Sequence, residues 1–265
     1  MVSANSSLRL ALLTACFVLL AACDRQPATP PPSQATPPAA AAATPAPAAA
    51  STGPAAIAAA VANRARPAED VARDADRKPA ETLAFFDVKP GEVVFEFVAG
   101  GGYFTELLSH TVGDTGRVVA TREEPKRIAD GRLPNVTAVE DREWGLAPGS
   151  VDLIFTALNY HDVVNLKADR PALLKNFMTI LKPGGIFAVI DHSAENGSGD
   201  RDVGTLHRID EAFVVSEVKA AGFELVGSSD LLRNPNDART LKVFDPAIRG
   251  KTDQFVLKFR KPTAG

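Results

Sequence analysis

The stretch VVFEFVAGGGYFT, residues 93–105, decides the fold of this chain. It is an apolar run that ends in consecutive glycines and continues into a segment with a helical pattern. Glycine lets the backbone turn sharply and approach a ligand, because it has no Cβ. The amino terminus of the following helix offers unpaired N–H groups to an anion or a polar group. The stretch therefore predicts a strand, a ligand-binding turn and a helix at the edge of an α/β sheet.

Strands and helices are expected to alternate on both sides of this turn. Continuous apolar strands separated by helices favour a seven-stranded, mostly parallel sheet with helices on both faces. The last apolar run alternates instead, with Phe255, Leu257 and Phe259 on one side, which suits an antiparallel edge strand. The expected strands are residues 93–98, 117–121, 136–139, 151–156, 186–191, 223–227 and 254–259, and the expected helices lie near 79–86, 104–111, 168–181 and 207–221.

Residues 1–22 have the organisation of an export signal. Arg9 is the one charged side chain before an apolar run over residues 10–20, which is shorter than the about 20 residues that span a bilayer. Small residues lead up to Cys23, as in a bacterial lipobox, and predict cleavage before Cys23 and lipidation of its sulfur. A plain secretory signal is the alternative. Asp24 favours the periplasmic face of the inner membrane as the location.

Residues 23–56 are rich in Pro and Ala and predict a flexible tether, with one folded domain over residues 57–265. The net charge of -3 gives no basic excess for nucleic acid, which is therefore not an expected partner. The two cysteines of the chain are Cys16, inside the signal, and Cys23. The predicted mature domain consequently contains neither a disulfide nor a cysteine nucleophile.

Four further segments extend the pattern around the glycine turn: residues 89–91, 116–118, 149–154 and 181–185. In this order and spacing they resemble the class I S-adenosylmethionine-dependent methyltransferases, over residues 74–260. More narrowly, a family of predicted bacterial methyltransferases is resembled at residues 77–81, 159–162, 191–192, 207–210 and 244–246. The resemblance implies a Rossmann-like fold, S-adenosylmethionine as cofactor and methyl transfer to a small-molecule or envelope acceptor that it does not identify.

The resemblance also assigns a cofactor site around the glycine turn. Two positions depart from the family pattern: Val98 replaces the first glycine, and Thr121 or Arg122 stands where an acid usually binds the ribose. Losing a charged hydrogen bond of that kind costs about 1.5–3 kcal/mol. The expected cofactor-binding residues are Glu96, Ala99, Gly100, Gly101, Gly102, Tyr103, Glu123 and Asp141.

Polar residues follow the fourth and fifth predicted strands and open the next helix, so we expect them to face one crevice. Histidine, with an unperturbed pKa near 6.5, suits a general base at neutral pH. His161 and His207 are the first candidates, with Asp162 or Asp210 orienting a ring. Helix capping or loop hydrogen bonding is the alternative for each residue. A metal site is a third option if the three His and three Asp converge, but without a compact ligand spacing it is not the favoured prediction. The expected catalytic residues are Tyr160, His161, Asp162, His192, His207 and Asp210.

Two functions remain open from the sequence. One is a lipid-anchored methyltransferase. The other is a non-catalytic lipoprotein that retains the fold and binds a small ligand or a protein partner, because export carries the domain away from the usual supply of S-adenosylmethionine. Residues 228–251 predict either a lid over the crevice or a solvated surface loop, with Arg233, Asn234, Asp237 and Arg239 at the entrance.

Overall fold

The computed structural model describes residues 52–121, 131–140 and 143–263 of the chain. The predicted signal, Cys23 and most of the predicted tether lie outside these residues, as do Glu123 and Asp141. None of the helices within the described residues has the length and apolar character that crossing a bilayer requires.

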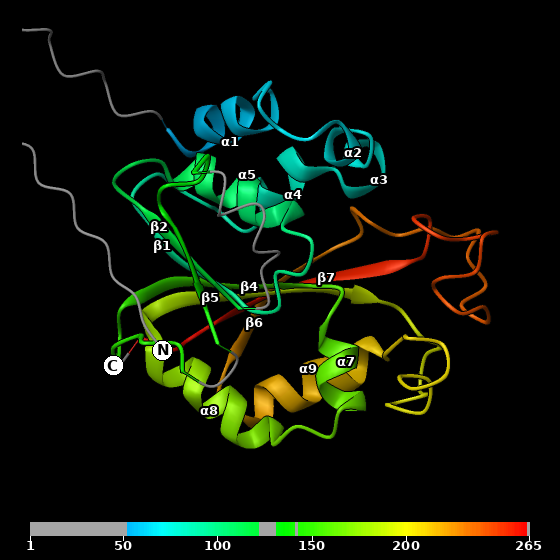
Figure 1. The fold of residues 1–265 in the computed structure, drawn as a ribbon. Coiled ribbons are helices and arrows are strands. Elements are labelled where there is room, and N and C mark those ends of the chain that lie inside the picture. Colours follow the sequence, from blue (N-terminus) through cyan, green and yellow to red (C-terminus); the bar gives the residue numbers. More distant parts are fainter. Residues whose placement is uncertain (1–51, 122–130, 141–142, 264–265) are drawn as a thin grey trace, which may run out of the picture. The chain divides into compact units, whose positions relative to one another are not determined.

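The centre of the fold is one seven-stranded sheet with the strand order β3-β2-β1-β4-β5-β7-β6 (Figure 1). The first five strands run parallel, and β7 is antiparallel to both of its neighbours. The predicted fold class is confirmed, but β7 is not the edge strand, since it lies between β5 and β6 and buries both of its faces. The strands are β1 Val93–Glu96, β2 Arg117–Thr121, β3 Val136–Val139, β4 Val151–Ala157, β5 Leu181–His192, β6 Glu224–Ser229 and β7 Gln254–Arg260.

Helices cover both faces of the sheet (Figure 1). One face carries α1 Gly53–Val61, α4 Pro79–Phe85 and α5 Tyr103–Val112, with the short helices α2 Ala68–Val71 and α3 Asp74–Arg77 beside them. The other face carries α7 Tyr160–Asn165, α8 Arg170–Ile180 and α9 Glu211–Ala220. Helix α1 begins before residue 57, so the predicted end of the tether falls inside a helix.

Helix α9 begins later than the sequence predicted, at Glu211 rather than near residue 207. The carboxylate of Asp210 accepts a hydrogen bond from the backbone N–H of Ala212, which makes Asp210 the N-cap. His207 has a φ of 56°, in the left-handed region that a right-handed helix excludes. Residues 207–210 therefore form a connection ahead of the helix.

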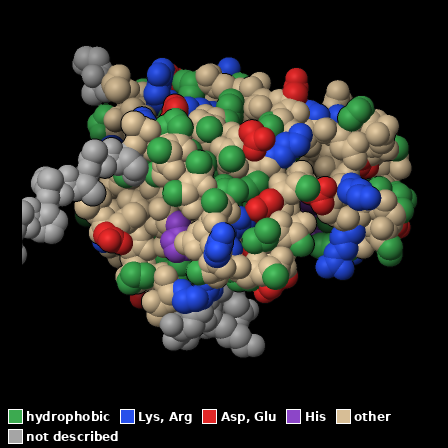
Figure 2. All heavy atoms as spheres, turned by 90° about the horizontal axis from the view of Figure 1, so that it is seen from above, with side chains coloured by type: hydrophobic (Ala, Val, Ile, Leu, Met, Phe, Trp, Pro, Cys, Tyr) green, Lys and Arg blue, Asp and Glu red, His purple; other side chains and the backbone are tan. Residues whose placement is uncertain are grey.

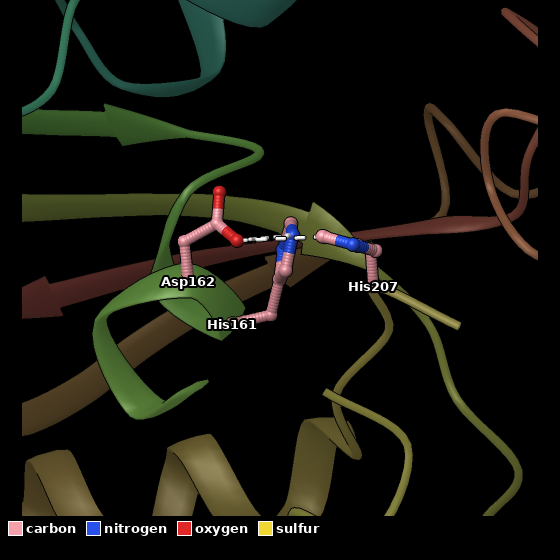
Figure 3. Close-up of side chains that lie close together, drawn as sticks. All are labelled: His161, Asp162 and His207. Atoms are coloured by element: carbon pink, nitrogen blue, oxygen red, sulfur yellow. Dashed lines mark ion pairs between the residues drawn. The ribbon is translucent and has the colours of Figure 1, made fainter. Parts of the chain in front are cut away.

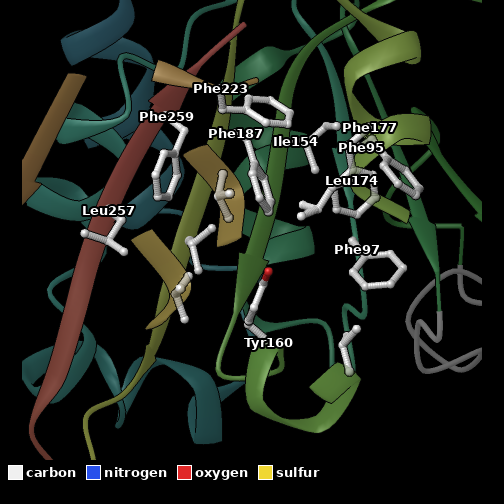
Figure 4. Packing of buried hydrophobic residues seen from close by; sticks show 14 of the residues in the cluster. Phe95, Phe97, Ile154, Tyr160, Leu174, Phe177, Phe187, Phe223, Leu257 and Phe259 are labelled. Carbon is white, nitrogen blue, oxygen red and sulfur yellow. The ribbon is translucent and has the colours of Figure 1, made fainter. Parts of the chain in front are cut away.

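The core consists of two apolar clusters, one on each face of the sheet. The larger includes Phe95, Phe177, Phe187 and Phe259 and packs beneath α8 and α9 (Figure 4). Trp144 is partly buried and packs against this cluster, and its ring centroid lies 4.7 Å from that of Phe95. The face that carries α1 and α5 shows charged side chains of both signs interspersed with apolar ones over its described part (Figure 2). Single exposed apolar side chains of this kind are ordinary on a protein surface.

The long connection between β6 and β7 is fastened to the carboxyl edge of the sheet by ion pairs. Arg208 is fully buried and pairs with Asp237 of this connection at 2.8 Å. Arg208 also donates to the backbone oxygens of Ser193 and Leu241. A second arginine, Arg233, pairs with Glu211 at the start of α9. These contacts hold the connection against the carboxyl edge of the sheet.

Candidate functional site

The glycine turn between β1 and α5 is held in an unusual backbone conformation. Gly100 and Gly102 have φ angles of 62° and 72°, where glycine avoids the strain that a side chain brings. Val98 also has a positive φ, of 60°. Its N–H donates to Thr121 Oγ1 at 2.9 Å, and its carbonyl accepts from Asn159 Nδ2 at 2.8 Å. The ends of β2 and β4 therefore hold the turn in place.

The side of the turn at Gly100 and Gly101 is open. A Cβ built at either glycine meets no heavy atom within 4 Å. A cavity of about 170 Å³ lies there. Its lining comes from the turn, from the end of β4 and from α3, and includes Glu96, Ala99, Gly100, Gly101 and Tyr103 among the predicted cofactor residues. Gly102 does not line the cavity and instead forms the N-cap of α5.

Two arginines line this cavity that the sequence analysis did not assign to it. The Arg73 and Arg77 guanidinium carbons lie 4.9 and 4.5 Å from the ring centroid of Tyr103. Burial, together with the neighbouring charge of Arg73, lowers the pKa of Arg77 to about 10, so that Arg77 stays protonated at neutral pH. The hydroxyl of Tyr103 donates to Asp74 Oδ1 at 2.7 Å, away from the cavity.

These residues fit the amino-acid end of S-adenosylmethionine. That end carries an ammonium and a carboxylate, and the buried residue Glu96 lines the cavity together with Arg73 and Arg77. A volume of about 170 Å³ is smaller than the roughly 300–1,000 Å³ of pockets for whole small ligands. The cavity therefore suits one end of the cofactor.

A second cavity of about 810 Å³ adjoins the first, because Val98 and Asn159 line both. It extends past the apolar side chains of Trp144 and Leu146 to Asp162 at the start of α7. Polar side chains line it as well, among them Lys167 and Asn176. The two cavities together connect the glycine turn to Asp162, one of the predicted catalytic residues.

His161, Asp162 and His207 converge at the carboxyl edge of the sheet, as the sequence predicted (Figure 3). Oδ1 of Asp162 lies 3.4 Å from Nε2 of His161 and 3.4 Å from Nδ1 of His207. The two imidazole rings are roughly perpendicular, with centroids 5.5 Å apart. His161 is 3% exposed, whereas the side chain of Asp162 reaches solvent.

Asp191, at the end of β5, orients His161. Its Oδ1 lies 2.7 Å from Nδ1 of His161, and its Oδ2 accepts the backbone N–H of the same residue at 2.7 Å. Burial works to lower the pKa of His161, but the charge and hydrogen bond of Asp191 outweigh it and raise that pKa. The sequence placed this orienting role on Asp162 or Asp210. The signal for Asp191 was its place at the end of a buried strand, directly before His192.

The remaining predicted catalytic residues have other contacts. The hydroxyl of Tyr160 donates to Glu217 of α9 at 2.5 Å inside the core, so the prediction that it faces the crevice is wrong. Asp210 is the N-cap of α9 and also accepts from the N–H of Gly197, which is a structural role. Nδ1 of His192 lies 2.7 Å from Thr252 Oγ1, and burial lowers the pKa of His192 to about 4, so its ring is neutral at pH 7.

The comparisons with known proteins agree with this geometry. Residues 95–189 match the family model of a methyltransferase domain. An uncharacterized methyltransferase of Synechocystis is 33% identical over 43% of this chain, and the match spans about half (51%) of that relative. A ubiquinone/menaquinone biosynthesis C-methyltransferase of Enterobacter is 26% identical over 69% of this chain and 70% of its own length.

Solved structures share the fold at lower sequence identity. A SAM-dependent methyltransferase from Aquifex aeolicus aligns with a TM-score of 0.52 and 18% identity, over 71% of this chain and 97% of its own. An S-adenosylmethionine-dependent methyltransferase from Mesorhizobium loti aligns with a TM-score of 0.51 and 15% identity, over 71% and 99%. Residues 95–189 therefore match a methyltransferase domain, and the described chain shares the fold of these solved methyltransferases. This likeness implies S-adenosylmethionine as the cofactor.

Proposed function

We propose that this chain is an S-adenosylmethionine-dependent methyltransferase, held by lipidated Cys23 at the periplasmic face of the inner membrane. The observation that carries the activity is the open glycine turn, with one buried carboxylate and two guanidiniums around a single small cavity. That charge pattern is complementary to a zwitterionic amino-acid end. The acceptor is a small molecule or an envelope component that binds at the adjoining crevice.

In the proposed reaction, one group of residues binds the cofactor and another binds the acceptor. The cofactor supplies an electrophilic methyl group on its sulfonium. Glu96 holds the ammonium of its amino-acid end, Arg73 and Arg77 hold the carboxylate, and the glycines let the backbone approach. The cluster of His161, Asp162 and His207 holds the acceptor and promotes loss of its proton. Fixing both reactants in one crevice is itself a large contribution to the rate.

Calorimetry on the purified full-length chain tests the activity at its first requirement. Titration with S-adenosylmethionine or S-adenosylhomocysteine is expected to show saturable binding to one site. A chain that gives no heat at millimolar ligand does not bind the cofactor. That outcome would support the alternative, a non-catalytic lipoprotein that retains the fold.

Replacing Arg77 by methionine is expected to weaken S-adenosylhomocysteine binding about 10- to 100-fold, because a charge-assisted hydrogen bond contributes about 1.5–3 kcal/mol. Arg201→Met is the matched control, since Arg201 is an exposed arginine whose side chain is 60% accessible and pairs with Glu195. Calorimetry and thermal melting of both variants separate lost binding from lost folding. If both variants bind S-adenosylhomocysteine with equal affinity, Arg77 does not contact the cofactor.

Replacing Cys23 by alanine is expected to release the protein from the membrane fraction, because the thioether that carries the lipid can no longer form. The measurement is fractionation of cells followed by detection of the chain in membrane and soluble fractions. A Cys16→Ala chain is the control, since that residue lies in the predicted signal. Continued membrane association of Cys23→Ala would show that another segment provides the anchor.

A further inference from the structure

The cluster of His161, Asp162 and His207 has the geometry of a metal site. The ligand atoms of the three side chains all lie within 4.8 Å of one another. We propose that they bind a single divalent transition-metal ion, of the kind that zinc exemplifies. Two imidazoles and one carboxylate are donors that such ions accept, whereas magnesium and calcium favour oxygen ligands.

The distances inside the cluster suit a shared ion better than direct hydrogen bonds. Oδ1 of Asp162 lies 3.4 Å from each histidine nitrogen, which is longer than the 2.7–3.2 Å of an N–H···O bond. Two atoms that each lie about 2.1 Å from one ion, at the tetrahedral angle, are about 3.4 Å apart. The three side chains point toward the same small volume (Figure 3).

His161 is already oriented as a ligand. Its Nδ1 is bonded to Asp191, which leaves Nε2 to face Asp162. Histidines that bind metals commonly donate the N–H of their other ring nitrogen to a carboxylate, and this hydrogen bond fixes the orientation of the ring. Asp191 is itself fixed, because it is fully buried and also accepts the backbone N–H groups of His161 and His192.

His207 provides an independent observation. Its Nδ1 is buried and has no hydrogen-bond partner within the described part of the chain. Leaving a buried polar atom unsatisfied is energetically unfavourable. The left-handed backbone of this residue, with φ 56°, adds strain. Phe244 packs against the ring, with centroids 4.9 Å apart, and holds it in this position. A bound ion would give this nitrogen the partner that it lacks.

Three protein ligands leave a coordination position open, as in catalytic rather than structural zinc sites. Asp162 lines the cavity of about 810 Å³, so an ion bound to this carboxylate would lie beside the space next to the glycine turn. An acceptor oxygen, nitrogen or sulfur bound to the ion would lose its proton to solvent water more readily, because the ion lowers the pKa of the bound group. His161 would then act as a ligand and not as the base. This last step rests on the proposed methyl transfer, whereas ion binding does not.

The test uses the untagged full-length chain, stripped with a chelator and titrated with Zn²⁺ by calorimetry. We expect one ion per chain, with Asp162→Ala and His207→Ala each weakening binding about 100-fold or more, and Asp191→Asn weakening it about 10- to 100-fold. Co²⁺ in place of Zn²⁺ is expected to give visible absorption bands that both ligand variants lose. His110→Ala is the matched control, since His110 lies in α5 beside Glu106, and its affinity for Zn²⁺ should not change.

Failure to bind Zn²⁺ would overturn the proposal, and so would equal affinity in His207→Ala and His110→Ala. The side chain of Asp162 is 39% exposed, so Asp162→Ala should fold, and melting of each variant verifies this. Cofactor calorimetry on the same samples keeps the two proposals apart. If the unchanged chain binds S-adenosylhomocysteine but not Zn²⁺, only the proposed ion site is refuted. If it binds Zn²⁺ but not S-adenosylhomocysteine, only the proposed methyl transfer is refuted.

Discussion

Replacing Gly101 by leucine is expected to abolish cofactor binding while leaving the fold intact. A Cβ at this glycine meets nothing within 4 Å, so the new side chain would extend freely into the cavity of about 170 Å³. It would occupy the space where the turn approaches the ligand. We expect the dissociation constant for S-adenosylhomocysteine to rise about 100-fold or more, which corresponds to roughly 2.7 kcal/mol. The melting temperature should change little, because surface substitutions usually change the free energy of unfolding by no more than about 0.5 kcal/mol.

Gly116→Ala is the matched contrast to Gly101→Leu. A Cβ at Gly116 would lie 2.6 Å from Val112 Cβ and 2.7 Å from the Glu92 carbonyl, both far from the cavity. This variant should lose stability through overpacking, by about 1–3 kcal/mol, and still bind the cofactor. The two variants thus distinguish a side chain that blocks the cofactor site from one that clashes with its packed neighbours. If Gly101→Leu binds S-adenosylhomocysteine as tightly as the unchanged chain, the turn does not contact the cofactor.

The sequence predicts most of the sheet because the relevant information is local. Strands β2 and β3 have the predicted bounds, since each is a short apolar run between turn residues. The position of β7 could not be predicted in the same way. Its alternating pattern is typical of an antiparallel strand, but its position between β5 and β6 depends on tertiary pairing that the local pattern does not contain. The start of α9 was missed because Asp210 acts as a cap, which a helical pattern alone does not reveal.

The residues of the candidate site also differ in whether local sequence predicts them. The glycine turn and the group of His161, Asp162 and His207 were predictable, because strand ends in a parallel sheet meet at one edge. Tyr160 and Asp210 were misassigned, since a position at the edge does not fix which way a side chain points. Arg73 and Arg77 come from α3 and the turn before it, where no local motif marks them. Only the tertiary packing of that region on α5 brings them to the cavity.

Removing Asp237 is expected to produce the largest loss of stability of any variant considered for this chain. The side chains of Arg208 and Asp237 are 0% and 2% exposed, so Asp237→Ala leaves a buried guanidinium without its carboxylate. Breaking a buried pair in this way costs about 3–5 kcal/mol. Urea denaturation at pH 7 measures the change. Glu195→Ala, which removes a partner of the exposed Arg201, is the control and should cost at most about 1 kcal/mol.

The dependence on pH gives this prediction a second, independent readout. Burial works to raise the pKa of Asp237, but the backbone N–H groups of Asp253 and Arg239 and the charge of Arg208 outweigh it and lower that pKa. A carboxyl whose pKa is lower in the folded state stabilises the fold fully above its unfolded pKa of about 3.9, and this contribution disappears as the pH falls through the folded value.

Asp237→Asn should therefore be clearly less stable than the unchanged chain at pH 7, and the difference should shrink as the pH falls below about 4, where Asp237 also becomes neutral. The connection between β6 and β7 is held over the sheet edge by this pair, so its loss should loosen the segment that carries Phe244 against His207. Zn²⁺ affinity of Asp237→Asn is then expected to fall together with stability. A constant difference in unfolding free energy from pH 7 to pH 3 would show that the charge of Asp237 does not carry the effect.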